Sequence, residues 1–125
     1  MVRKINRDEL RDMICSGQDI RIVDVLERSS FNQEHIKGAI SLPLAEIETK
    51  ADKALRRDDK IVVYCASFEC QASTNAAEKL MSMGFKDVWD YKGGIKDYKE
   101  AGFPLEGALH RSESKSFPCS ACAAC

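Results

Sequence analysis

The chain has 125 residues, a net charge of −1, an apolar share of 44% and a charged share of 31%, which is typical of one ordinary globular domain. This charge balance argues against a nucleic-acid or membrane-surface protein, and no apolar run approaches the roughly 18 residues of a membrane span. The basic N-terminus has no apolar segment typical of a secretory signal, so we expect a cytoplasmic protein.

The first part of the chain predicts two helices around a buried strand. Apolar residues at helical spacing predict a helix over residues 7–15, which Asn6 and Glu9 would cap as a pair. The β-branched run at residues 20–25 predicts a short buried strand. Ser30 is expected to open a short second helix that contains Phe31 and His35.

The middle of the chain continues to alternate between extended and helical patterns. The clearest strand covers residues 60–64, and Ser73, or Asn75 with Glu78, is expected to cap a helix that Gly84 ends. The other expected elements are a loop with a short extended piece at 38–43, a helix at 47–55, a strand at 87–91 and a helix at 95–101. This alternation predicts an α/β fold with a mostly parallel sheet covered by helices on both faces.

Six cysteines are unevenly placed along the chain. A secreted disulfide framework would spread its cysteines, so this pattern favours thiol chemistry or metal binding. Cys15 stands alone, Cys65 and Cys70 lie close together, and Cys119, Cys122 and Cys125 crowd the C-terminus. We expect Cys15 to be a core residue at the end of the first helix.

Cys65 follows the clearest predicted strand and precedes a strong predicted helix. In a parallel α/β sheet the reactive crevice lies beyond the carboxyl ends of the strands. A loop that curls into a helix directs several backbone N–H groups at one centre, where they favour negative charge and lower the pKa of a thiol. Cys65 is therefore a candidate nucleophile. From the residues alone, the alternative is a buried cysteine that packs the strand end.

Phrases spread over about residues 3 to 105 resemble the rhodanese domain. They lie, in order, at residues 23–27, 31, 35–43, 61–65, 84–85 and 93–95. The resemblance implies a rhodanese fold over residues 1–105, with a five-stranded mostly parallel sheet and helices on both faces. It also implies sulfane-sulfur transfer through Cys65, without a metal or an organic cofactor. The remaining residues, 106–125, are rich in Gly, Ala, Ser and Cys and are expected to form a flexible tail.

The implied mechanism has two displacements. The Cys65 thiolate attacks the sulfane sulfur of a small donor and becomes a persulfide, and an acceptor thiol, which a protein could carry, then takes the outer sulfur. Loop amides would stabilise the charged forms, and the expected substrate-binding loop consists of Ala66, Ser67, Phe68, Glu69, Cys70 and Gln71. The resemblance gives Asp24 and His35 supporting, structural roles.

The loop departs from the usual rhodanese pattern, Cys-x-x-Gly-x-Arg-Ser. Phe68 stands where Gly is common and Cys70 where Arg is common, and the loop looks longer than usual. Without an Arg clamp, and with Glu69 nearby, binding of the thiosulfate dianion is expected to suffer more than that of a persulfide or thiol donor. Rhodanese-like phosphatases and arsenate reductases need an Arg at the position of Gln71, which argues against those activities.

Cys70 opens a second interpretation of the loop. Two cysteines five positions apart on a curling loop can come within disulfide range. Cys70 could then resolve a persulfide on Cys65 or protect Cys65 from over-oxidation. The alternative is that Cys70 only packs the loop.

The tail cysteines also leave several interpretations open. Cys119, Cys122 and Cys125 form two overlapping Cys-x-x-Cys pairs, which suit a metal or a labile disulfide. A closed metal site would need a fourth ligand, such as His110 or a partner chain. The tail could instead carry sulfur to or from Cys65, or hold thiols without a function. The alternatives to a sulfurtransferase are therefore a thiol-redox or metal-responsive module and a catalytically silent interaction domain.

Overall fold

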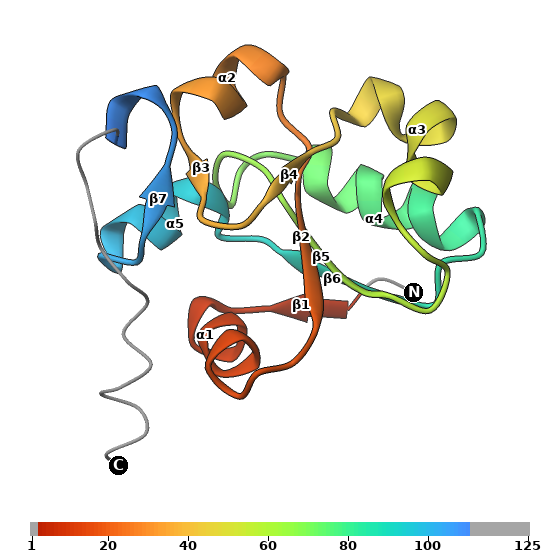
Figure 1. Cartoon of the computed structure of the whole chain (residues 1–125), viewed down its shortest axis with the longest axis horizontal. Helices are drawn as coiled ribbons and strands as arrows, with labels where there is room; N and C mark the ends of the chain where they lie inside the picture. Colours follow the sequence, from red (N-terminus) through yellow and green to blue (C-terminus); the bar gives the residue numbers. More distant parts are fainter. Residues whose placement is uncertain (1–2, 111–125) are drawn as a thin grey trace.

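The computed structural model describes residues 3–110 and contains a five-stranded, all-parallel sheet (Figure 1). The order of the strands across the sheet is β1-β6-β5-β2-β4, with β5 in the centre. The strands are β1 (Arg3–Ile5), β2 (Ile20–Asp24), β4 (Ile40–Ser41), β5 (Lys60–Tyr64) and β6 (Asp87–Tyr91). The predicted α/β class and five-stranded sheet are confirmed.

Helices connect these strands, and a small second sheet lies beside them. The helices are α1 (Arg7–Cys15), α2 (Arg28–Gln33), α3 (Ile47–Ala54), α4 (Ala72–Ser82) and α5 (Gly94–Glu100), with single 3₁₀ turns η1 (Leu44–Glu46) and η2 (Ala108–His110). The second sheet pairs β3 (His35–Ile36) with β7 (Leu105–Glu106) in antiparallel fashion. None of the helices in the described part of the chain is long and apolar enough to cross a membrane.

The sheet has a hydrophobic core on each face, because successive strand residues point to opposite sides. From β5 and the residue after it, Ile61, Val63 and Cys65 join the core formed with α3 and α4. Val62 and Tyr64 join the other core, formed with α1 and α5. Helices α3 and α4 lie on the right in Figure 1 and α5 on the left. Cys65 is therefore on the α4 face, at the carboxyl end of the central strand.

Several predicted boundaries agree with the structure. Helix α1 covers the predicted residues, and its capping box is present: the Asn6 side chain accepts from the amide of Glu9, whose carboxylate accepts from the amide of Asn6. Strands β5 and β6 also have the predicted bounds. These elements are well predicted because their signals are local.

The predicted starts of two helices are wrong. Helix α2 begins at Arg28 after an extended Glu27, so Ser30 lies inside the helix rather than at its cap. The helix ends at Gln33, so His35 is not helical as predicted but begins β3. Helix α4 begins at Ala72 without a side-chain cap, and both predicted caps, Ser73 and Asn75, are helical. Ser73 is instead buried beside the Cys65 sulfur, a tertiary contact that a local pattern does not reveal.

The predicted boundary between domain and tail at residue 105 falls inside β7. Leu105 and Glu106 pair with β3, and the η2 turn after them contacts α2, so residues 106–110 pack with the domain rather than apart from it. The predictions for Cys119, Cys122 and Cys125 concern positions outside the described residues. Cys15 lies at the end of α1, but the prediction of a core residue is wrong, because its side chain is only half-buried and forms a disulfide bond.

Candidate active site

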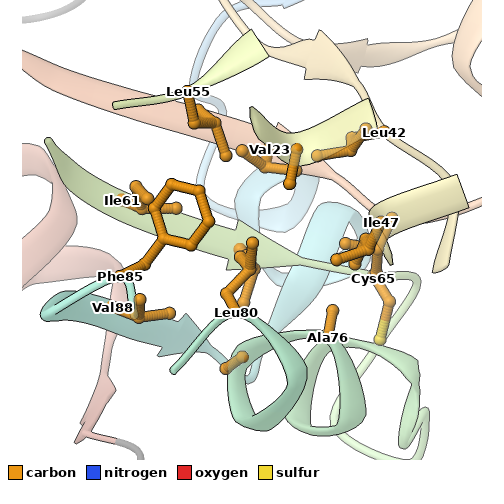
Figure 2. Packing of buried hydrophobic residues seen from close by; sticks show 14 residues of the cluster. Val23, Leu42, Ile47, Leu55, Ile61, Cys65, Ala76, Leu80, Phe85 and Val88 are labelled. Atoms are coloured by element: carbon orange, nitrogen blue, oxygen red, sulfur yellow. The ribbon is translucent and has the colours of Figure 1, made fainter. Parts of the chain in front are cut away.

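The loop between β5 and α4 brings two thiols into contact. Cys65 is completely buried and Cys70 is half-buried, and a hydrogen bond joins their side chains. The Cys65 Sγ atom also lies 3.5 Å from the carbonyl oxygen of Cys70 and 3.5 Å from the Ser73 hydroxyl. Figure 2 shows the Cys65 sulfur turned towards α4, near Ala76. The fold thus places a pair of thiols at the start of this helix.

The beginning of α5 holds the first part of the loop in place. The amides of Ile95 and Lys96 donate to the carbonyl oxygens of Cys65 and Ala66, each over 3.0 Å. Gly94 makes this approach possible because its φ is +65° and a Cβ there would lie 2.4 Å from the Cys65 carbonyl oxygen. The backbone at Cys65 is therefore fixed by a second segment of the chain.

Lys92 brings a positive charge to the second part of the loop. Its ammonium group donates a 2.7 Å hydrogen bond to the carbonyl oxygen of Cys70 and is half-buried between β6 and α5. Lys92 was not among the predicted site residues, although the register of the strands identifies it. Tyr64 at the end of β5 pairs with Tyr91 at the end of β6, so the residues that follow, Cys65 and Lys92, emerge side by side.

The two thiols ionise differently because their surroundings differ. Burial raises the pKa of Cys65, and the hydrogen bond to Cys70 raises it further. Burial would also raise the pKa of Cys70, but hydrogen bonds from Cys65 and from two backbone amides, with the charge of Lys92, lower it below the ordinary value. The first thiolate of the pair is thus on Cys70. The predicted lowering of the Cys65 pKa is wrong, because burial outweighs the few donors that face its sulfur.

The backbone amides that face the sulfurs are only partly the predicted ones. The amides of Ala66 and Ala72 contact the Cys70 sulfur, and that of Ser73 contacts the Cys65 sulfur. The amide of Cys70 itself donates to the Ser67 carbonyl oxygen over 3.1 Å. The amides that face the sulfurs therefore come from the start of the loop and from the first turn of α4. They are divided between the sulfurs of Cys65 and Cys70, whereas the prediction had a single group of amides around Cys65.

The rest of the predicted substrate-binding loop faces outward. The Phe68 side chain is 63% exposed, and Glu69 and Gln71 are also exposed. A small cavity of about 160 Å³ lies between Phe68 and α5, with Lys96 in its lining. Neither cysteine lines this cavity. Cys70 is half-buried and Cys65 is completely buried, so a donor reaches the Cys65 sulfur only when the loop shifts.

Asp24 supports the strand that carries Cys65. Its carboxylate accepts from the Tyr64 hydroxyl over 2.7 Å and from the Leu26 amide over 2.9 Å. The same hydroxyl accepts from the amide of Ile36 over 3.0 Å. Burial raises the pKa of the Asp24 carboxyl group. These bonds join the ends of β2 and β5 to β3, directly before Cys65.

His35 stabilises a corner of the fold away from the sulfurs. Its ring stacks on Phe31 with 3.7 Å between the ring centres, and Nδ1 lies 2.7 Å from the Phe31 carbonyl oxygen. Its Nε2 atom lies 3.6 Å from the Glu106 carboxylate. These contacts connect His35, at the start of β3, to Phe31 in α2 and to Glu106 in β7. No group of three or more metal-binding side chains occurs within residues 3–110.

Comparisons with known proteins agree with this architecture. The chain is 30% identical over 99 residues to a thiosulfate sulfurtransferase, GlpE, of Coxiella burnetii, covering 79% of this chain and 89% of that protein. It is 37% identical over 91 residues to a GlpE of Shewanella oneidensis, covering 70% and 84%. The solution structure of a rhodanese-like domain from an Anabaena protein has a TM-score of 0.80 at 30% identity, covering 93% and 87%.

The family model agrees with these individual matches. The model described as rhodanese-like domain matches residues 6–101, which include β2, β5, β6 and the whole cysteine loop. The parallel sheet and the thiol at the carboxyl end of its central strand lie inside this match. The chain therefore belongs to the rhodanese-like domain family.

Proposed function

We propose that this protein is a sulfurtransferase that takes sulfane sulfur from a small donor and passes it to a thiol or another nucleophilic acceptor through a persulfide on Cys65. The observation that carries the proposal is the buried Cys65 thiol at the end of the central strand, in contact with an ionisable second thiol. The similarity to thiosulfate sulfurtransferases supports the same reaction class.

The contact between the thiols suggests how Cys65 becomes nucleophilic despite its raised pKa. With Cys70 ionised, the Cys65 thiol donates its proton towards the Cys70 sulfur. As Cys65 attacks the sulfane sulfur of the donor, this proton passes to Cys70 and the rest of the donor leaves as an anion. The products are a Cys65 persulfide anion and a neutral Cys70 thiol. The amide of Ser73 faces the sulfur of Cys65 and stabilises the developing charge.

The charges around the loop favour a particular donor class. An Arg clamp for a dianion is missing from residues 66–73, and the exposed Glu69 adds a negative charge. Lys92 supplies one cation from the next strand, next to Cys70. One cation can balance the charge of a monoanionic donor such as an organic persulfide or polysulfide, whereas the thiosulfate dianion keeps a second charge that Glu69 and the Cys70 thiolate repel. We therefore propose a persulfide or polysulfide as the preferred donor. Because the reaction needs reduced thiols, we also propose that the protein acts in a reducing compartment such as the cytoplasm.

The proposal is tested by following sulfur on the reduced protein. Wild type and the Cys65→Ser variant receive glutathione persulfide and then cyanide as the acceptor, and thiocyanate is measured. We expect the variant to lose transfer by about a hundredfold or more, since the nucleophile is gone. Circular dichroism and thermal melting check that the variant folds. Transfer at the wild-type rate in a folded Cys65→Ser protein would refute the proposal.

A further inference from the structure

We propose that Cys70 is a resolving thiol, which attacks the Cys65 persulfide, closes a Cys65–Cys70 disulfide and releases the sulfane sulfur as hydrosulfide. This inference rests on the persulfide proposed above. It adds a second reaction of that intermediate, with Cys70 of the same chain instead of an external acceptor. The protein would then divide sulfur between transfer to an acceptor and reduction to sulfide.

The geometry of the loop brings the two sulfurs together before any reaction. Their side chains are hydrogen-bonded, and the backbone bends back at Ser67, whose carbonyl oxygen accepts from the Cys70 amide over 3.1 Å. Lys92 holds the Cys70 carbonyl oxygen, which lies 3.5 Å from the Cys65 sulfur. A disulfide bond is about 2.05 Å long, so the two sulfurs have to move closer together from hydrogen-bond contact to form it.

Burial gives the internal thiol an advantage over an external one. Cys65 has no exposed surface, whereas Cys70 is already in contact with it. An intramolecular nucleophile in contact with its target acts at a very high effective concentration. An external acceptor can reach the buried Cys65 sulfur only after the loop moves. The amides of Ala66 and Ala72 and the charge of Lys92 favour the thiolate form of Cys70, which is the reactive one.

The resolving step balances in atoms, charge and electrons. The Cys70 thiol first passes the proton taken from Cys65 to the outer sulfur of the persulfide, and the resulting Cys70 thiolate then attacks the inner sulfur. A bond forms between the two cysteine sulfurs, the bond from Cys65 to the outer sulfur breaks, and the outer sulfur leaves with the electron pair and the proton as HS⁻. The sulfane sulfur is reduced by two electrons, and the two cysteines are oxidised to the disulfide.

Return to the dithiol state requires an external reductant. Two molecules of a small thiol, or one dithiol, reduce the disulfide by exchange and restore both cysteines. With reductant present the cycle converts sulfane sulfur to sulfide. When reductant is scarce the pair remains a disulfide, and Cys65 is unavailable for sulfur transfer.

The test is a single-turnover experiment on the reduced full-length chain after removal of reductant. Wild type, Cys70→Ser and Cys70→Ala each receive one equivalent of glutathione persulfide, which leaves as glutathione, and released sulfide is trapped and measured. Trypsin leaves Cys65 and Cys70 on one peptide between Lys60 and Lys79, and cleavage after Glu69 separates them. Mass spectrometry then distinguishes a persulfide from a disulfide. Cys15→Ser is the control for loss of a cysteine outside the loop.

We expect wild type and Cys15→Ser to release one sulfide per persulfidated chain and to contain the Cys65–Cys70 disulfide. Both Cys70 variants should keep the added sulfur on Cys65 and release sulfide about tenfold more slowly or less, because the internal nucleophile is absent. A stable Cys65 persulfide in wild type, matching the Cys70 variants, would overturn the resolving role and leave the sulfurtransferase proposal intact. Absence of sulfur uptake and of sulfide release in every protein would overturn both.

Discussion

The ammonium group of Lys92 lies 2.7 Å from the carbonyl oxygen of Cys70 and lowers the pKa of the Cys70 thiol. This relationship joins two segments that are 22 residues apart in the sequence. It fixes the second thiol of the loop and places a positive charge beside it in a chain whose loop has no Arg. Lys92 is thus a positioning and electrostatic residue for the thiol pair.

Replacement of Lys92 should weaken the reactivity of Cys70. In Lys92→Gln the charge is lost while a hydrogen-bond donor remains, so the pKa of Cys70 rises and less thiolate is present near neutral pH. We expect alkylation of Cys70 by iodoacetamide at neutral pH to slow by about two- to fivefold, the effect of a partly exposed charge. Lys92→Arg keeps the charge and should react like wild type. Equal rates for Lys92→Gln and Lys92→Arg would show that the charge has no such role.

The two cysteines should react with alkylating reagents in a defined order as the pH rises. The pKa of Cys70 is below the ordinary thiol value, so its thiolate appears first, whereas the pKa of Cys65 is raised and its thiolate appears at higher pH. Pulse alkylation at a series of pH values, followed by cleavage after Glu69, measures each position separately. We expect labelling of Cys70 at lower pH and labelling of Cys65 only later.

Single-cysteine variants check that this order comes from the contact between the thiols. Cys65→Ala removes a hydrogen-bond donor to the Cys70 thiolate, so the pKa of Cys70 should rise. Cys70→Ala removes a neighbouring negative charge, so the pKa of Cys65 should fall. Two titration curves that do not move in these variants would contradict the proposed coupling.

The sequence predicted the fold much better than the site. Strands β5 and β6 and helix α1 have strong local signals, and the resemblance gave the five-stranded sheet. Strand β1 lies at the sheet edge and has only three residues, and β3 and β7 have two each. Such short elements are fixed by pairing with distant segments, β1 with β6 and β3 with β7, which a local pattern does not contain.

At the site, the sequence identified the cysteines but not their surroundings. Cys65 and Cys70 were recognised from residue type and loop position, because these are properties of one segment. The contributions of Lys92, Gly94 and Ser73 come from other elements or from the helix interior. The direction of the Cys65 pKa depended on burial by α3 and α4. Electrostatics of this kind require the tertiary structure.

Gly94 should be sensitive to a single added methyl group. Gly94→Ala puts a side chain at a positive φ and 2.4 Å from the Cys65 carbonyl oxygen, so α5 has to move away from the cysteine loop. We expect a loss of about 2–4 kcal/mol in the free energy of unfolding, from backbone strain plus the clash, and a loss of sulfur transfer. Urea unfolding and the thiocyanate assay measure the two effects.

Gly102 provides a matched control at the other end of α5. Its φ is +77°, but a Cβ there meets no atom within 4 Å. Gly102→Ala should therefore lose about 1 kcal/mol, from the backbone conformation alone, and keep the wild-type transfer rate. If both alanine variants lost stability and transfer to the same extent, the close approach of Gly94 to the loop would have no special importance.

The Tyr64–Asp24 hydrogen bond should contribute to stability because both partners are buried. Tyr64→Phe leaves a carboxylate oxygen of Asp24 and the Ile36 amide without their partner, which should lower the free energy of unfolding by about 1–3 kcal/mol. The effect of Tyr64→Phe should also depend on pH. Burial already raises the pKa of Asp24, and loss of the hydrogen bond from the Tyr64 hydroxyl raises it further. A carboxyl group with a raised folded-state pKa stabilises the fold in its protonated form, and this contribution is lost as the pH rises through that pKa. The variant should therefore lose more stability near pH 7 than at acidic pH. Urea unfolding at both pH values, combined with Asp24→Asn in a double-mutant cycle, measures the coupling; additive effects at both pH values would show that the two side chains contribute independently.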